Sequence, residues 1–329
     1  ALSLPKRSPP ATGFPVVIYM HGTGGDRFSF VNENEDLSCL FAQIGTAVIA
    51  IDQPLHGARN PSDVPAIMLT VNLTNVNSSL DLLRQAAFDT LETSLLIRKL
   101  VVPAEITTQK QAIAFDPNKI LFMGHSQGTT TGVPYLMIDP DVKAAMLSGS
   151  GGNMIYFVKD RLFKGDDEIA DLLNMTPEEA GKTLKSWFGV AGEPVDEFYF
   201  LLTLFQSITE PVDPVNYAPY VMINTSTPKH VFMTEGFKDV YLPPSTNEAL
   251  AVALGVDMLT PLMKDVPFLE IIRKEPLTPP VSLNVSVPSG VKLTGGDQQY
   301  ENGRHWVVFE DDRASRQVQE FFRTYVETG

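Results

Sequence analysis

The sequence ILFMGHSQG, at residues 120–128, decides the fold. Its four apolar residues predict the end of a buried strand, and Gly124, Ser126 and Gly128 follow in the pattern G-x-S-x-G. A serine on a sharp strand-to-helix turn has a strained backbone that presents its hydroxyl at the edge of a sheet. Glycine is needed on both sides because a Cβ there would clash with the turn. The pattern therefore predicts that Ser126 is a nucleophile.

The rest of the chain alternates between apolar runs and helical patterns. Strands are predicted at residues 15–20, 46–51, 119–123, 143–148, 230–235 and 291–295, and helices at 80–102 and 313–326. Apolar runs that alternate with helices are typical of a parallel sheet covered on both faces. The fold class indicated is α/β with a mostly parallel central sheet.

Composition excludes several classes of function. The 25 basic and 39 acidic side chains give a net charge of −14, which argues against nucleic acid or an anionic membrane surface as a partner. No apolar run approaches the roughly 20 residues that span a bilayer. The single cysteine, Cys39, cannot form a disulfide within the chain or a cysteine-based metal site.

The chain begins with alanine, so we expect that a segment upstream has been removed. Three explanations remain open for this segment: a signal peptide, a longer segment, or a start of the sequence that was set by choice. A signal peptide would place the protein in the periplasm or outside the cell. Residues 1–13 are rich in proline and serine and are expected to form a linker.

A serine hydroxyl becomes a good nucleophile when a histidine takes its proton and an acid orients that histidine. On this kind of sheet the order along the chain is serine, acid, histidine. Of the five histidines, His305 alone fits, because it follows the last predicted strand and precedes the final helix. Asp239 follows the strand at 230–235 and is the predicted acid. Asp257, Asp265 and Asp297 are the alternatives.

A glycine-rich loop provides a place for negative charge. The sequence HGTGG at residues 21–25 follows the first predicted strand and lacks the lysine and spacing of a phosphate-binding loop. Hydrolysis of an acyl compound passes through an oxyanion, which backbone N–H groups stabilise. One donor is expected from Thr23 or Gly24 and the other from Gln127, while His21 is expected to hold the loop.

Together these motifs resemble the α/β-hydrolase superfamily, specifically its bacterial serine esterase and lipase branches, from Phe14 to Val326. The sequence DQPLHG at residues 52–57 is similar to a segment that borders the active site in this family, which makes His56 a candidate pocket residue. The resemblance implies ester or related acyl-transfer chemistry without a metal or an organic cofactor. Family members generally have two further strands before the strand that leads into the glycine-rich loop. Residues 1–13 cannot supply both, so the first strands are expected to be missing or the sheet to begin one or two strands short.

Residues 151–228 separate two predicted strands where one loop and one helix would suffice. They are predicted to form a helical cap, which leaves residues 14–150 and 229–329 as the core. The cap's aromatic residues Phe198, Phe200 and Phe205 are candidates for the wall of an acyl pocket. Residues 53–79 and 258–288 form two further long loops.

The function predicted is hydrolysis of small-molecule carboxylic esters with short or medium acyl chains, through a Ser-His-Asp triad and an acyl-enzyme. A lipase, phospholipase, acyltransferase or peptidase on the same fold remains an alternative. A different class is a non-catalytic binding protein with this fold, but such proteins usually lack the serine or the histidine. A metalloenzyme is disfavoured because no H-E-x-x-H or similar ligand spacing occurs.

Overall fold

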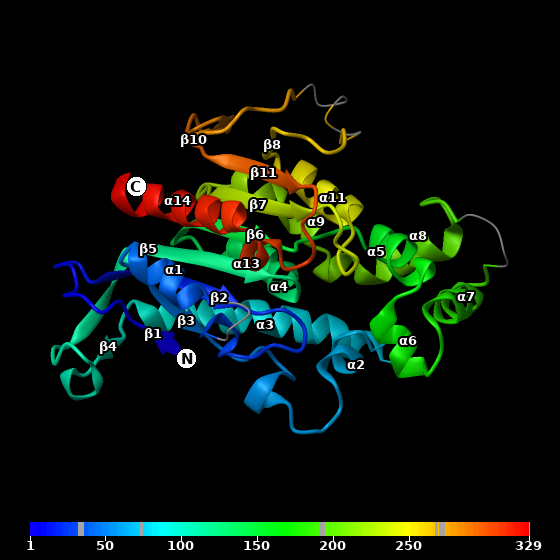
Figure 1. Cartoon of the computed structure of the whole chain (residues 1–329), viewed down its shortest axis with the longest axis horizontal. Coiled ribbons are helices and arrows are strands. Elements are labelled where there is room, and N and C mark those ends of the chain that lie inside the picture. The colour runs from blue at the N-terminus through cyan, green and yellow to red at the C-terminus, as the bar shows by residue number, and fades with distance from the viewer. Residues whose placement is uncertain (32–35, 73–74, 191–194, 267–268, 270–273, 329) are drawn as a thin grey trace.

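The computed structural model describes residues 1–31, 36–72, 75–190, 195–266, 269 and 274–328 (Figure 1). The predicted core and the predicted cap each contain residues outside this part: 32–35, 73–74, 267–268, 270–273 and 329 in the core, and 191–194 in the cap.

The strands are β1 (Leu2–Ser3), β2 (Phe14–Met20), β3 (Ala47–Ala50), β4 (Val101–Val102), β5 (Ile113–His125), β6 (Val142–Ser148), β7 (His230–Gly236), β8 (Asp257–Leu259), β9 (Val285–Ser286), β10 (Lys292–Leu293) and β11 (Gly295–Tyr300). The helices are α1 (Leu37–Gln43), α2 (Ala66–Thr70), α3 (Val76–Ile97), α4 (Gln127–Ile138), α5 (Met154–Asp160), α6 (Asp167–Leu173), α7 (Pro177–Trp187), α8 (Phe200–Thr209), α9 (Pro214–Tyr217), α10 (Pro219–Met222), α11 (Pro244–Leu254), α13 (Val307–Glu310) and α14 (Asp312–Thr328).

The main sheet has the strand order β1-β3-β2-β5-β6-β7-β11-β8. All neighbours from β3 to β8 in this order are parallel, and β1 pairs antiparallel with β3. Off this path, β4 pairs antiparallel with β5. Parallel strands end at the same edge of a sheet, and in such folds ligands bind outside that edge. The loops after β2, β5, β7 and β11, which carry the predicted site residues, therefore meet at one edge.

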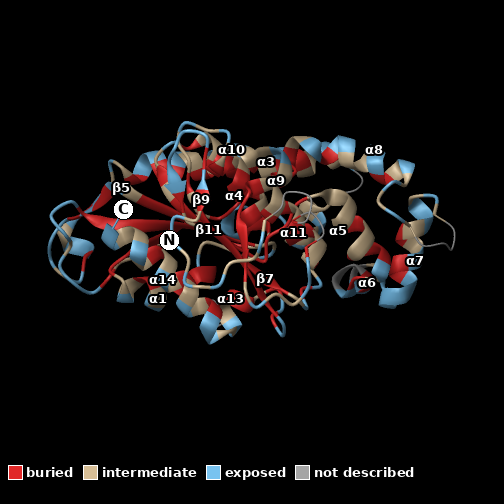
Figure 2. Cartoon of the chain, turned by 90° about the horizontal axis from the view of Figure 1, so that it is seen from above, coloured by how far each residue is buried: buried red, intermediate tan, exposed pale blue. Residues whose placement is uncertain are grey.

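Helices cover both faces of the sheet, as Figure 2 shows from above. Along β2, Val16 and Ile18 belong to the core under α3, α4 and α11, whereas Val17 and Tyr19 belong to the core under α1 and α14. Successive side chains of a strand point to opposite faces, so burial of both faces makes the strand apolar at every position. This explains why the central strands are continuous apolar runs in the sequence.

The first edge of the sheet carries β1, which lies inside the segment predicted as a linker. Leu2 pairs with Ile49 and Ser3 with Val48, and Ala1 and Ala50 exchange backbone hydrogen bonds at 2.7 and 3.0 Å. A short antiparallel strand thus covers the edge of β3 where the family resemblance implied two strands. Covering this edge removes a row of unpaired backbone groups.

The last strands differ from the sequence-based prediction. Residues 292–293 of the strand predicted at 291–295 form β10, which pairs with β9 in a separate hairpin. The sheet continues instead through β11, with the sequence GGDQQY, and β8. β11 has few apolar residues. Its buried Gln299 side chain bonds to Glu235 and to the backbone N–H of Met263 rather than packing in an apolar core.

The chain between β6 and β7 divides into two parts. Helices α5–α8 lie together at one end of the molecule (Figure 1) and pack around a small apolar core that includes Val158, Phe163, Leu184 and Leu202. Helices α9 and α10 instead pack against α4 and α11, and they contribute to the main core.

Candidate active site

Ser126 occupies the turn between β5 and α4 with φ 54° and ψ −123°. A positive φ is uncommon for a residue with a side chain and costs about 1–3 kcal/mol, so the surroundings must hold it. The Ser126 N–H donates to the carbonyl of Ser148 at 2.9 Å, and its carbonyl accepts from the N–H of Thr129 at 2.8 Å. The neighbouring strand and the first helical turn therefore fix the strained serine.

The glycines around Ser126 are required by close approach. A Cβ on Gly128 would lie 2.0 Å from the carbonyl oxygen of Met20, and one on Gly124 would lie 2.6 Å from that of Gly128. Gly22, in the loop after β2, would place a Cβ 2.9 Å from the Cβ of Ser126. The glycine-rich loop thus lies directly against the serine turn.

His305 and Asp239 form a buried pair. The Nδ1 of His305 donates to Oδ2 of Asp239 at 2.7 Å. Oδ1 of Asp239 accepts from the backbone N–H groups of Tyr241 at 2.8 Å and Leu242 at 2.9 Å. With its proton on Nδ1, the neutral ring has its lone pair on Nε2. Of the four aspartates considered from the sequence, Asp239 is the one that the structure brings to His305.

The ring of His305 lies beside the residues that flank the serine. Its centroid is 4.9 Å from that of His125, and a Cβ on Gly149 would lie 2.9 Å from its Cε1. Gly149 follows Ser148, whose carbonyl holds the Ser126 N–H. Among the hydrogen bonds of the described residues, none joins Ser126 Oγ to His305. Such bonds often tighten only when substrate is bound.

Two of the three predicted oxyanion residues, Thr23 and Gln127, meet beside Ser126. Gln127 is the first residue of α4, so its N–H has no acceptor within the helix. Its side-chain carbonyl accepts from the Thr23 hydroxyl at 2.8 Å and from the Thr70 hydroxyl at 3.3 Å. Thr23 and Gln127 line the same pocket as Ser126, whereas Gly24, with φ 81°, does not.

Two histidines singled out from the sequence, His21 and His56, do not line the pocket that contains Ser126. His21 Nε2 accepts from the N–H of Gln53 at 3.2 Å and Nδ1 contacts the carbonyl of Gly22 at 2.8 Å. Burial lowers the pKa of His21 to about 4, so the ring is neutral and holds the loop. His56 lies behind it, with ring centroids 5.3 Å apart, and does not line the pocket.

A pocket of about 160 Å³ opens on Ser126. Part of its wall comes from residues 151–228, namely Met154, Phe157, Arg161, Phe205, Thr209 and Val212. The opposite part comes from α2, α3 and their connection, including Ile67, Thr70, Val71, Leu80 and Leu83. Phe205 is thus brought to the pocket. Phe198 and Phe200 are 83% and 73% exposed and lie elsewhere.

Several residues that line this pocket were not predicted from the sequence. Thr70, Leu80 and Leu83 come from a loop and helix noted only for length and periodicity, and that length was the available signal. Arg161 had no signal, because a single arginine between helices resembles a solvated surface residue. In the structure its side chain is 8% exposed.

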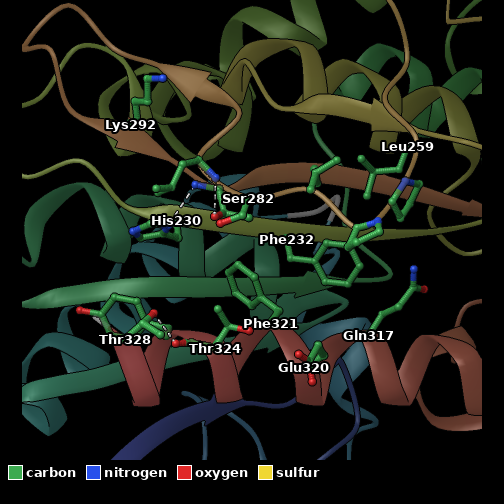
Figure 3. A pocket seen from close by; sticks show the side chains of 17 residues that line it. His230, Phe232, Leu259, Ser282, Lys292, Gln317, Glu320, Phe321, Thr324 and Thr328 are labelled. Atoms are coloured by element: carbon green, nitrogen blue, oxygen red, sulfur yellow. Dashed lines mark hydrogen bonds between the residues drawn. The ribbon is translucent and has the colours of Figure 1, made fainter.

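A larger cavity of about 880 Å³ lies between α14 and the sheet, lined by residues of β7, β8, β11 and residues 279–283 (Figure 3). Phe232 and Phe321 line it with their ring centroids 5.8 Å apart, and His230 lines it from the start of β7. None of Ser126, Asp239 and His305 lines it. Volume alone therefore does not locate the candidate active site.

Within the described part of the chain, no three or more His, Cys, Asp or Glu side chains are arranged to hold a metal ion. Nor does any described helix combine the length and the apolar character needed to cross a membrane.

No family model and no curated protein matches the chain. Solved structures do. An acetyl xylan esterase from Paenibacillus sp. R4 is 15% identical, with 97% of this chain and 78% of that chain covered and a TM-score of 0.56. Acetyl xylan esterase 1 from Thermoanaerobacterium sp. JW/SL YS485 is 17% identical, with coverage of 99% and 78% and a TM-score of 0.53. A puromycin-hydrolyzing peptidase from Mycobacterium tuberculosis is 15% identical, with coverage of 98% and 37% and a TM-score of 0.51.

Proposed function

We propose a function for this chain from its fold, which is the α/β-hydrolase fold with a mostly parallel central sheet flanked by helices, as predicted from the sequence. On that premise we propose that it is a serine hydrolase that cleaves carboxylic esters with short acyl chains. The observation that carries the proposal is the strained Ser126 at the carboxyl edge of the sheet, beside the buried His305–Asp239 pair. The esterases and the peptidase among the similar structures agree with this general class of reaction.

The first half of the proposed reaction forms an acyl-enzyme. Ser126 Oγ attacks the ester carbonyl carbon while Nε2 of His305 accepts the hydroxyl proton, and the carbonyl oxygen becomes an oxyanion. Collapse of this intermediate breaks the bond to the alcohol oxygen, which takes the proton from Nε2. Asp239 keeps Nδ1 of the ring protonated and stabilises the positive charge that the ring carries between these steps.

The second half releases the acid. Water gives a proton to Nε2 of His305 and attacks the acyl carbon. Collapse then breaks the bond to Ser126 Oγ, which recovers the proton. In both halves the N–H groups of Gln127 and of Thr23 or Gly24 are the proposed oxyanion donors. Removing one such donor typically costs a factor of about 100–1,000 in rate.

The size of the pocket favours a short acyl group. A cavity of about 150 Å³ holds a molecule the size of benzene. The pocket at Ser126 has about 160 Å³, so an acyl chain longer than about six carbons would have to displace its walls or extend into solvent. This supports an esterase over a lipase or a phospholipase, whose acyl chains are longer.

The proposed cap is the group of helices α5–α8. Its residues Phe157 and Phe205 form part of the apolar wall next to Ser126, and such a wall excludes water from the acyl group. Helices α9 and α10, also within residues 151–228, are assigned to the core because Val221 and Met222 are buried in it.

A series of p-nitrophenyl esters from acetate to laurate tests the proposal. We expect the highest kcat/KM at acetate to butyrate and a steep fall beyond hexanoate. Ser126→Ala should lose activity by roughly 10,000-fold or more while its Tm stays within a few degrees of wild type. Added butanol would divert the product to a butyl ester if the protein were an acyltransferase. Full activity of Ser126→Ala would overturn the proposal.

A further inference from the structure

Arg161 connects the insertion to the loop that carries the predicted catalytic acid. It follows α5, and its side chain is almost fully buried on the wall of the pocket that contains Ser126. Its Nη1 donates to the backbone carbonyl of Tyr241 at 3.2 Å. Its Nε pairs with the carboxylate of Asp166, which is also buried.

The guanidinium group also contacts two aromatic rings. Its central carbon is 5.1 Å from the ring centroid of Tyr241 and 5.3 Å from that of Phe157. A planar guanidinium can stack on rings through its faces while it donates hydrogen bonds through its edge, which an ammonium group cannot do. The site therefore uses the shape of arginine as well as its charge.

Tyr241 in turn contacts both partners of the buried pair. Its N–H donates to Oδ1 of Asp239 at 2.8 Å, and its ring centroid lies 5.1 Å from that of His305. A continuous path of contacts thus runs from Asp166 through Arg161 and Tyr241 to the two residues that would activate Ser126.

We propose that Arg161 is a positioning residue: it holds the carbonyl and ring of Tyr241, and through them the orientation of Asp239 and His305. This inference rests on the proposed function. It adds that the insertion sets the geometry of the triad in addition to lining the pocket. Displacement of a catalytic group by about 1 Å can cost 100-fold in rate, so loss of the guanidinium should lower kcat by about 10- to 100-fold.

Three variants test this role. Arg161→Lys keeps the charge and loses the planar group. The double variant Arg161→Met with Asp166→Asn removes both charges, so no unpaired buried carboxylate destabilises the fold. Lys159→Met is the matched control, because Lys159 also lies over a tyrosine ring in α5 and pairs with Glu197. Among the described residues, no hydrogen bond or ion pair joins Lys159 to residues 239–242.

Each preparation should be titrated with a fluorophosphonate, so that kcat refers to reactive serines only. For p-nitrophenyl acetate, we expect both Arg161 variants to lower kcat about 10- to 100-fold and to lower the fluorophosphonate inactivation rate in parallel, with KM within about twofold of wild type. Lys159→Met should leave both constants unchanged.

A higher KM with unchanged kcat would overturn the inference and make Arg161 a substrate contact. Unchanged kcat per titrated serine with a lower Tm would also overturn it, because Arg161 would then only stabilise the fold. Failure of the proposed function is a separate result: the wild-type protein itself would neither hydrolyse esters nor react with the fluorophosphonate.

Discussion

The sheet core and the α5–α8 insertion differ in how they bury their apolar residues. β2 and β6 contribute to the apolar cores on both faces of the sheet and have almost every side chain buried. The insertion has a small core of its own and exposes Trp187, Phe198 and Phe200. The candidate nucleophile, acid and base all lie on loops of the core. The comparison suggests that the core fixes the reacting groups, while the insertion shapes the space in front of them.

The largest effect should come from the core. His305→Ala removes the base. In Asp239→Asn the amide oxygen stays with the N–H groups of Tyr241 and Leu242, so an N–H donor faces Nδ1 of His305 and favours the wrong tautomer. Each variant should lower kcat by roughly 10,000-fold. Steady-state kinetics with p-nitrophenyl acetate measures this, and circular dichroism checks that the fold persists. Near wild-type activity of Asp239→Asn would mean that another carboxylate orients His305.

A smaller effect is expected from the insertion. Phe205→Ala should enlarge the pocket and raise the relative kcat/KM for hexanoate over acetate by several-fold, since one methylene in an apolar pocket is worth about 1–3 kcal/mol. Phe200→Ala is the matched control, because this side chain of the same helix is exposed. Equal shifts in the two variants, measured across the ester series, would contradict the assignment of Phe205 to the acyl pocket.

The smallest effect concerns a buried acidic cluster under α11. Burial raises the pKa of Glu235 to about 9 and that of Asp297 to about 8, and no side chain among the described residues donates a hydrogen bond to the Asp297 carboxylate. A carboxyl with a raised folded pKa contributes stability that is present below its unfolded pKa, near 4, and is lost as pH rises toward its folded pKa.

The variant Asp297→Asn should therefore melt at a higher temperature than wild type at pH 8 and differ less at pH 4. Each kcal/mol of unfolding free energy that the substitution restores should raise Tm by about 2–4 °C. Thermal melts from pH 4 to pH 9 measure this, with the exposed Asp63→Asn as control. The same Tm difference at all pH values would show that ionisation of Asp297 is not involved.

Much of the core could be predicted because its signals are local. The apolar runs of β2, β5 and β7 reflect burial on both faces, and the glycines beside Ser126 reflect a turn with no room for a Cβ. Chain order then restricted the histidine to His305. In these cases a few adjacent residues, or their order, contain the physical reason.

The remaining features depend on contacts distant in sequence. β11 lacks an apolar pattern, and its buried Gln299 bonds instead to Glu235, 64 residues earlier. Phe200 and Phe205 lie on one helix and look alike in the sequence, and only packing decides which reaches the pocket. Arg161 reaches Tyr241, 80 residues later, through a geometry that no motif records.

The central claim is that Ser126 is a nucleophile activated by His305. Mass spectrometry after treatment with a fluorophosphonate tests it most directly. We predict one adduct on the peptide that contains Ser126, no adduct in Ser126→Ala, and much slower labelling in His305→Ala. Labelling of a different residue, or labelling of Ser126 at the same rate with and without His305, would contradict the account.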